Sequence, residues 1–127
     1  MIKVLIADDQ ELIRQSLSIV LNTKEGIEVT DTVANGQEVI ASVRKNRPDV
    51  ILMDIMMPVM DGLTAARTIR DLERQDAKTI PIIAMTANAF REDAERCMEA
   101  GMNAHLAKPL DDEKIKQTIS EELRKQI

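Results

Sequence analysis

The sequence contains no tryptophan or tyrosine and has a single phenylalanine, a single histidine and a single cysteine in 127 residues. With Phe90 as the one aromatic residue, any hydrophobic core has to be built from aliphatic and methionine side chains. The lone Cys97 excludes an internal disulfide bond, which agrees with a reducing compartment. No apolar run approaches the roughly 20 residues that span a membrane, and no signal peptide is recognisable. We therefore expect a cytoplasmic protein without a membrane segment.

The chain also lacks an excess of positive charge. It has 22 acidic and 17 basic residues, and the net charge is −5. Because domains that bind nucleic acid by broad electrostatic attraction are usually basic, we expect no direct nucleic-acid binding. The length is typical of one domain, and the hydrophobic fraction of 44% is enough for one core. We therefore expect a single domain over residues 1–127.

Two kinds of apolar pattern alternate along the chain. Short runs rich in β-branched residues predict strands at Val4–Ala7, Ile27–Val33, Val50–Met53, Pro81–Met85 and Ala104–Ala107. Between them, apolar residues at three- and four-residue spacing predict helices with buried faces, among them Leu12, Ile13, Leu17, Val20 and Leu21 in the first and Phe90, Ala94, Cys97 and Met98 in the fourth. Five strand–helix units in alternation predict an open, doubly wound α/β domain with a parallel sheet.

Residues that start and stop helices agree with this division. Asp61 precedes one helical pattern as a candidate N-cap, and Gly26 and Gly101 come directly after two others, where a left-handed residue commonly ends a helix. The segment Val50–Met53 is apolar on both faces, as expected for a strand that is covered by helices on each side.

Polar residues lie where the predicted strands end. Asp8 and Asp9 follow the first strand, Asp54 the third, Thr86 the fourth, and Lys108 the fifth. In open parallel sheets, ligands bind outside the carboxyl ends of the strands. We therefore expect three carboxylates, a hydroxyl and an ammonium group to converge on one edge of the sheet.

Carboxylates at such close range repel one another, which would raise the pKa of at least one of them unless a cation were bound. A hard divalent cation suits all-oxygen ligands, so Mg²⁺ is expected and Mn²⁺ is an alternative. Zinc would need histidine or cysteine, and His105 and Cys97 occur elsewhere in the sequence. Mg²⁺ is usually held by one or two carboxylates together with phosphate oxygens, which suggests that the site receives a phosphoryl group.

The remaining groups suit phosphoryl chemistry. Asp54 is a carboxylate that needs no base to act as a nucleophile, and carboxylates form acyl phosphates in other phosphoryl-transfer proteins. Lys108 can neutralise one phosphoryl oxygen, and Thr86 can donate a hydrogen bond to another. Positioning and charge stabilisation of an in-line transfer are the usual work of a protein in this chemistry.

Four segments of the sequence closely resemble response-regulator receiver domains of two-component signalling systems. They are Ile6–Gln10, Asp54–Gly62, Met85–Ala87 and Lys108–Pro109, and they occur in the order and spacing of that family. The resemblance covers essentially the whole chain. It implies a flavodoxin-like (βα)5 domain with a parallel sheet in the order 2-1-3-4-5.

The resemblance also implies roles for the site residues. Asp54 would be phosphorylated, and Asp9, Asp54 and the backbone carbonyl of Met56 would bind Mg²⁺ directly. Asp8 would act mainly through a bound water, while Thr86 and Lys108 would contact the phosphoryl oxygens.

The donor in this family is usually a phosphohistidine on a histidine kinase or a histidine phosphotransfer protein, although acetyl phosphate often serves. The aspartyl phosphate is later lost to water, so the resemblance implies a signalling protein and not a turnover enzyme. It also implies an output surface at roughly residues 89–123, a monomer or a phosphorylation-dependent dimer, and a candidate cis peptide bond between Lys108 and Pro109.

One position departs from the family pattern. Receivers often have a tyrosine or phenylalanine three residues before the lysine, and this side chain turns inward as the threonine moves toward the phosphate. Here the position is His105, whose charge near neutral pH depends on its surroundings. We hypothesise that Thr86 and His105 form the switch of this chain.

The two halves of the sequence resemble different receivers. The C-terminal half, from Met85 to Asn103, is similar to receivers that are fused to hybrid histidine kinases, whereas Ile6–Arg14 is more similar to transcriptional response regulators. The sequence leaves open whether the chain stands alone, comes from a larger protein or is engineered.

Three other functions share part of this sequence pattern. A phosphatase of the haloacid dehalogenase type needs a second aspartate two residues after the nucleophile, where this chain has Met56. A flavodoxin-like flavin carrier would need aromatic residues to stack on the flavin. A receiver fold that acts as an interaction module without phosphorylation remains an alternative, although all the expected site residues are present.

Overall fold

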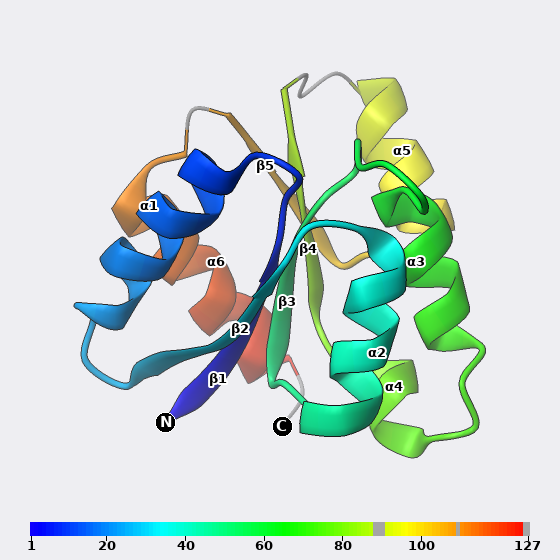
Figure 1. The fold of residues 1–127 in the computed structure, drawn as a ribbon, viewed down its shortest axis with the longest axis horizontal. Helices are drawn as coiled ribbons and strands as arrows, with labels where there is room; N and C mark the ends of the chain where they lie inside the picture. The colour runs from blue at the N-terminus through cyan, green and yellow to red at the C-terminus, as the bar shows by residue number, and fades with distance from the viewer. Residues whose placement is uncertain (88–90, 109, 126–127) are drawn as a thin grey trace.

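The computed structural model describes residues 1–87, 91–108 and 110–125. Its centre is a parallel five-stranded sheet in the order β2-β1-β3-β4-β5 (Figure 1). The strands are β1 (Ile2–Ala7), β2 (Ile27–Val33), β3 (Val50–Asp54), β4 (Ile82–Thr86) and β5 (Ala104–Ala107). The strand order and the alternation with helices confirm the predicted doubly wound α/β fold.

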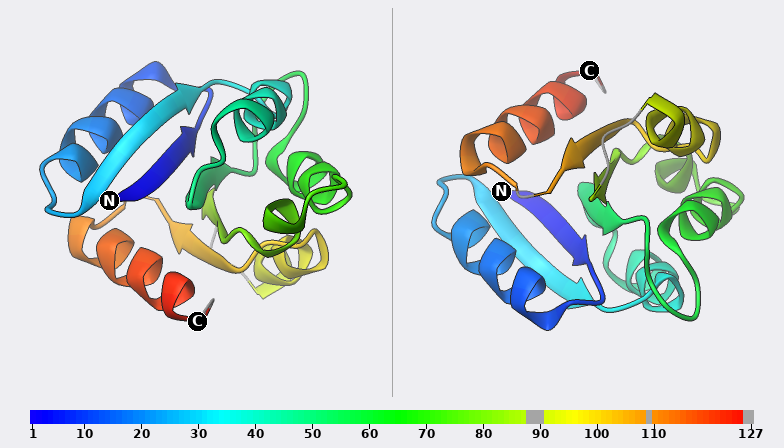
Figure 2. Two further views of the ribbon diagram at one scale, coloured as in Figure 1. Left: turned by 90° about the horizontal axis from the view of Figure 1, so that it is seen from below. Right: turned by 90° about the horizontal axis from the view of Figure 1, so that it is seen from above.

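Helices cover both faces of this sheet (Figures 1 and 2). On one face lie α1 (Glu11–Asn22) and α6 (Asp112–Arg124). On the other lie α2 (Gly36–Asn46), α3 (Gly62–Arg70), α4 (Gln75–Thr79) and α5 (Arg91–Glu99). This arrangement explains why β3 is buried along its whole length and reads as a continuous apolar run.

The sheet divides the hydrophobic core into two clusters. Successive residues of a strand point to opposite faces, so Leu5 packs in the cluster under α2 and α3, while Ile6 packs in the cluster under α1 and α6. Ile51 and Leu52 of β3 divide between the two clusters in the same way. The described members of both clusters are aliphatic residues, methionine and the buried Cys97, as the shortage of aromatic residues predicted.

Two of the three predicted helix boundaries are confirmed. The Asp61 carboxylate accepts a hydrogen bond from the backbone N–H of Thr64 at 2.7 Å, which makes Asp61 the N-cap of α3. Gly101 follows the end of α5 at Glu99 and has a φ of 98°, in the left-handed region that glycine adopts readily. Gly26 also has a positive φ of 84°, but the prediction that it directly follows a helix was wrong, since α1 ends at Asn22 and Thr23 is its C-cap.

The structure differs from the sequence-based expectations in two further respects. The short helix α4 was not predicted, because five residues with the single buried Ala77 are too few to show a helical period. The assignment of Leu12 and Met98 to buried helix faces was wrong, since they are 75% and 59% exposed. Ile13 and Cys97, which the same two patterns also placed on buried faces, do pack against the core.

Among the described residues, none of the helices combines the length and the apolar composition that crossing a bilayer requires. The carboxyl ends of all five strands lie at one edge of the sheet, which is the upper edge in Figure 1.

Candidate functional site

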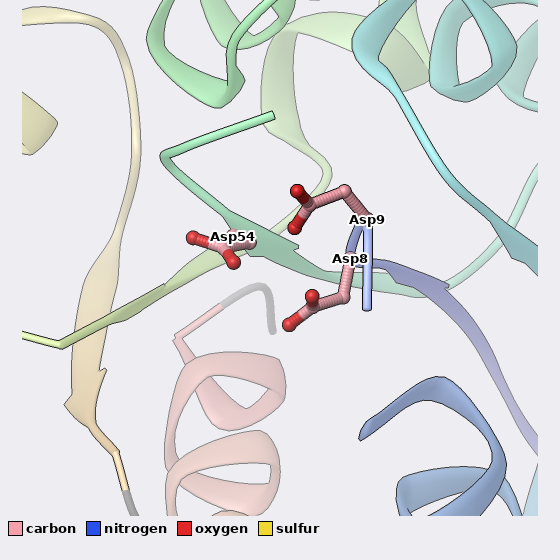
Figure 3. Close-up of side chains that lie close together, drawn as sticks. All are labelled: Asp8, Asp9 and Asp54. Carbon is pink, nitrogen blue, oxygen red and sulfur yellow. The ribbon is translucent and has the colours of Figure 1, made fainter. Parts of the chain in front are cut away.

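Three carboxylates meet at this edge of the sheet. Asp8 directly follows β1, and Asp54 ends β3, the strand that pairs with β1. Asp8, Asp9 and Asp54 each offer an oxygen atom, and these atoms lie within 4.8 Å of one another (Figure 3). Asp8 and Asp54 are buried, with 0% and 6% exposure, whereas Asp9 is exposed. The group is therefore open to solvent on the side of Asp9.

Lys108 joins the two buried carboxylates. Its Nζ atom lies 2.9 Å from Oδ2 of Asp8 and 2.8 Å from Oδ2 of Asp54. Lys108 follows β5, and its backbone N–H donates to the carbonyl oxygen of Thr86 at 2.8 Å, which fixes the start of the segment that carries the side chain. Lys108 is 100 positions from Asp8 and 54 positions from Asp54 in the sequence, and the strand order brings the three residues into one ion-pair network.

Backbone groups hold the other carboxylate oxygens. Oδ1 of Asp8 accepts the N–H of Gln10 at 2.9 Å, and Oδ1 of Asp54 accepts the N–H of Met56 at 3.0 Å. Arg14 donates to the carbonyl oxygen of Asp8 at 2.7 Å. Sequence reasoning missed the contact of Arg14, because an arginine in the first turns of a helix gives no signal for a backbone partner.

The surroundings change the pKa values of two of these groups. Burial raises the pKa of Asp54 more than its hydrogen bonds with Lys108 and the N–H of Met56 lower it, and the charge of Asp8 adds to the increase. Burial lowers the pKa of Lys108, but its hydrogen bonds and ion pairs with Asp54 and Asp8 outweigh this effect and raise it. We expected repulsion between the aspartates to raise the pKa of at least one carboxyl group. The pKa of Asp54 is raised, but burial is a larger cause than the charge of Asp8.

The loop between β3 and α3 surrounds Asp54 in a tight path. A Cβ atom at Gly62 would collide with the backbone oxygen of Asp54, so only glycine fits there without displacement of the strand end. Val59 has a φ of 66°, and the N–H of Met60 donates to the carbonyl of Pro58 at 2.6 Å across it. A β-branched residue rarely adopts this strained turn, and no local pattern in the sequence indicated it.

Thr86 and His105 lie in different environments. Thr86 ends β4, is 3% exposed and borders a hollow of about 440 Å³ together with Met56 and Asp61. His105 lies in the middle of β5 and is exposed at the surface. In this structure His105 therefore does not occupy the interior beside Thr86.

The donor atoms present suit a hard cation. They are carboxylate oxygens, and the exposed Asp9 leaves room for water to complete a coordination shell, as Mg²⁺ requires. Among the residues with described positions, His105 and Cys97 are not members of the cluster, so the arrangement does not suit zinc.

Some expectations fall on residues whose structure is not described. These are the peptide bond before Pro109, the side chain of Phe90 and the beginning of the expected output surface at residue 89.

Comparison with known proteins identifies relatives over nearly the whole chain. The family model of the response regulator receiver domain matches residues 4–120. The chain is 34% identical to probable histidine kinase 1 of Oryza sativa subsp. indica, with 95% of this chain covered, and 40% identical to hybrid signal transduction histidine kinase L of Dictyostelium discoideum, with 92% covered. It spans 15% and 7% of the length of these two relatives.

Solved structures show the same fold. The receiver domain of a sensor histidine kinase from Pseudomonas aeruginosa, with a magnesium ion coordinated in its active site cleft, is 36% identical and has a TM-score of 0.84. That match covers 95% of this chain and 96% of the other. The chemotaxis response regulator CheY4 of Vibrio cholerae is 34% identical, with a TM-score of 0.86 and coverage of 96% and 98%.

Proposed function

The chain belongs to the response regulator receiver domain family of two-component systems, and from this premise we propose that Asp54 accepts a phosphoryl group. The donor is a phosphohistidine of a histidine kinase or a histidine phosphotransfer protein. The observation that supports this most directly is the buried Asp54 carboxylate, whose Oδ2 lies 2.8 Å from the Lys108 ammonium beside Asp8 and Asp9.

The proposed transfer forms one bond and breaks another. An oxygen of the Asp54 carboxylate attacks phosphorus, the phosphorus–nitrogen bond of the phosphohistidine breaks, and the imidazole leaves with the electron pair of that bond. Lys108 would exchange its ion pair with Asp54 for one with a phosphoryl oxygen, and the Thr86 hydroxyl would donate a hydrogen bond to another phosphoryl oxygen.

Asp9, Asp54 and the backbone carbonyl of Met56 would hold Mg²⁺, and Asp8 would act through a water molecule. When bound, Mg²⁺ supplies positive charge that offsets repulsion between the carboxylates and the incoming phosphoryl group. The same oxygen donors would also accept Mn²⁺. The magnesium ion in the related P. aeruginosa receiver supports this proposal.

Phosphorylation would act on the surface formed by α5, β5 and α6. We propose that Thr86 moves toward the phosphoryl group and that the exposed His105 then turns inward, which changes this surface for partners or for a phosphorylation-dependent dimer. Crystal structures with and without beryllofluoride test this step. An identical His105 side-chain conformation in both would contradict it.

We expect no sustained turnover of a substrate. A phosphatase of the haloacid dehalogenase type has a second aspartate, its general acid, at the position that Met56 occupies here. Hydrolysis of the aspartyl phosphate would therefore proceed without a dedicated acid, and it would end each signal. We propose that residues 1–127 act as one receiver domain in the cytoplasm.

Incubation with acetyl phosphate and Mg²⁺, followed by intact mass measurement, tests the central step. We expect the parent protein to gain one phosphoryl group, and we expect Asp54→Asn or removal of Mg²⁺ with EDTA to abolish the gain. Asp71→Asn, at an exposed aspartate outside the site, is the matched control and should be phosphorylated like the parent. A phosphoryl group on Asp54→Asn would contradict the assignment.

A further inference from the structure

An arginine outside the carboxylate cluster contacts the backbone of the site. Arg14 lies at the beginning of α1, and its Nη1 atom donates to the carbonyl oxygen of Asp8 at 2.7 Å. The side chain of a helical residue leans toward the N-terminus of its helix, so Arg14 reaches back over the connection between β1 and α1. Neither the proposed transfer nor the proposed cation site gives Arg14 a role.

The carbonyl of Asp8 belongs to the peptide group that joins Asp8 to Asp9. Because a peptide group is planar, a contact that holds its oxygen also holds the N–H of Asp9 and the direction in which the Asp9 side chain leaves the backbone. Figure 3 shows the side chains of both residues extending toward Asp54. The orientation of this one peptide group therefore affects how close the carboxylate of Asp9 comes to that of Asp54.

Other contacts hold the carboxylate of Asp8 but not the peptide group that follows it. Oδ1 of Asp8 accepts the N–H of Gln10, and Oδ2 accepts the ammonium group of Lys108. Gln10 is the N-cap of α1, but its side chain makes no capping hydrogen bond. Within the described ranges, the guanidinium of Arg14 is the only hydrogen-bond donor to the carbonyl of Asp8.

The charge of Arg14 acts on the site in a second way. Arg14 is half-buried and forms no ion pair with the described residues, so its charge strengthens the hydrogen bond to the Asp8 carbonyl. The same charge would repel a divalent cation at the nearby carboxylates. By charge alone Arg14 would weaken cation binding, whereas by position it would favour it. The two effects have opposite signs and can be separated.

We propose that Arg14 is a positioning residue of the cation site. By holding the peptide group between Asp8 and Asp9, it directs the Asp9 carboxylate toward Asp54 and increases the affinity for Mg²⁺. The inference rests on the proposed function for the identity of the cation. Residues that orient metal ligands commonly change metal affinity by about 10- to 100-fold.

An NMR titration of backbone amides with MgCl₂, without a phosphoryl donor, tests this role. Arg14→Met removes the charged donor and keeps most of the side-chain length, and it should raise the Kd for Mg²⁺ by about tenfold. Arg44→Met, at an exposed arginine of α2, changes the net charge equally and should keep the Kd within about twofold.

A second variant covers a failure of the first to fold. Arg14→Lys keeps a charged donor on a shorter side chain, so its Kd should lie between those of the parent and Arg14→Met. A lower Kd in the Arg14 variants would mean that the charge acts and not the position. Either a lower or an unchanged Kd would overturn the proposal.

The metal-free protein gives an independent readout. A hydrogen bond to the Asp8 carbonyl polarises the peptide group whose N–H belongs to Asp9. Arg14→Met should therefore shift the amide nitrogen resonance of Asp9 before Mg²⁺ is added, with smaller shifts elsewhere. Shifts of equal size throughout the sheet would indicate a general loss of packing and would contradict a positioning role.

Phosphorylation by acetyl phosphate at a series of Mg²⁺ concentrations separates this proposal from the proposed function. Arg14→Met should need about ten times more Mg²⁺ for its half-maximal rate and reach the rate of the parent at saturation. A lower rate at every Mg²⁺ concentration, with the same half-saturation, would show a merely structural role. If Mg²⁺ binding depends on Arg14 but the parent is not phosphorylated, the role of Arg14 stands and the proposed function is wrong. A parent that binds no Mg²⁺ would overturn both.

Discussion

At the scale of single residues, the site is governed by two buried aspartates that share one lysine. Asp8 and Asp54 are nearly inaccessible to solvent, so their charges depend on Lys108 and on single backbone N–H groups. The pKa of Asp54 is raised, chiefly by burial, which means that its ionised form is less favourable in the folded chain than in the unfolded one. The Asp54 carboxylate is thus kept in place at a cost in stability.

This cost predicts a pH-dependent effect of Asp54→Asn in metal-free buffer. Below the ordinary pKa of an aspartate, the carboxyl is protonated in both the folded and the unfolded chain, so the cost is absent. The cost develops as the pH rises from this value and is complete above the raised pKa of the folded chain. We expect Asp54→Asn to unfold at a higher urea concentration than the parent at neutral pH, with a difference that vanishes in acid. Urea midpoints across this pH range measure it, and a less stable variant at neutral pH would contradict the explanation.

At the scale of structural elements, the β3–α3 loop and the start of α3 set the position of Asp54. Gly62 lies against the backbone of Asp54 and Ile55, and its N–H donates to the carbonyl of Ile55 at 3.1 Å. Asp61 caps the same helix turn. The strand end and the helix start are therefore one unit, and a change in either moves the carboxylate.

Gly62→Ala tests this coupling. The added methyl group would force the end of β3 away, so we expect a loss of about 1–3 kcal/mol in the free energy of unfolding and a loss of phosphorylation by acetyl phosphate. Gly26→Ala is the matched control. It is strained by a φ of 84° but has no atom within 4 Å of the new methyl group, so it should lower stability and leave phosphorylation unchanged. Normal phosphorylation of Gly62→Ala would show that the loop adapts.

A second connection between elements runs through Arg70. Its guanidinium donates to the carbonyl oxygens of Gly101 at 2.9 Å and Ala77 at 3.1 Å, and to Oδ1 of Asn103 at 2.8 Å. The same Asn103 oxygen accepts the N–H of Ile82 at 2.9 Å. Burial lowers the pKa of Arg70, which reflects the cost of holding this cation away from water. Arg70 thereby links α3 to α4, to the end of α5 and to the start of β4.

Arg70→Met would remove these three contacts while keeping most of the side-chain volume. We expect a loss of about 2 kcal/mol in unfolding free energy, because the partner oxygens lose charged donors. Arg67→Met, on the exposed side of the same helix, should change stability by less than about 0.5 kcal/mol. Equal urea midpoints of the two variants would show that the hydrogen bonds of Arg70 only offset the cost of its burial.

At the scale of the whole molecule, cation binding should stabilise the fold. A ligand that binds only the folded chain adds about 1.4 kcal/mol at a concentration ten times its Kd. For a domain of this size that corresponds to an increase of about 4 °C in the melting temperature. We expect this increase for the parent protein with Mg²⁺ and its loss in Asp9→Asn, measured by differential scanning calorimetry. Stabilisation of Asp9→Asn by the same amount would place the cation elsewhere.

The sequence determined the fold class, the strands to within two residues at each end, and the set of polar residues at the strand ends. It could do so because β-branched runs, helical spacing and capping residues are local properties of the chain, and because parallel strands end at the same edge. Local patterns did not reveal α4, the exposure of Leu12 and Met98, the strained turn at Val59 or the exposed position of His105.

Tertiary structure decided the rest, because distance and burial depend on packing. The contact of Lys108 with both Asp8 and Asp54 requires the strand order β1-β3-β4-β5. The raised pKa of Asp54 depends on how completely the surrounding elements exclude water from it.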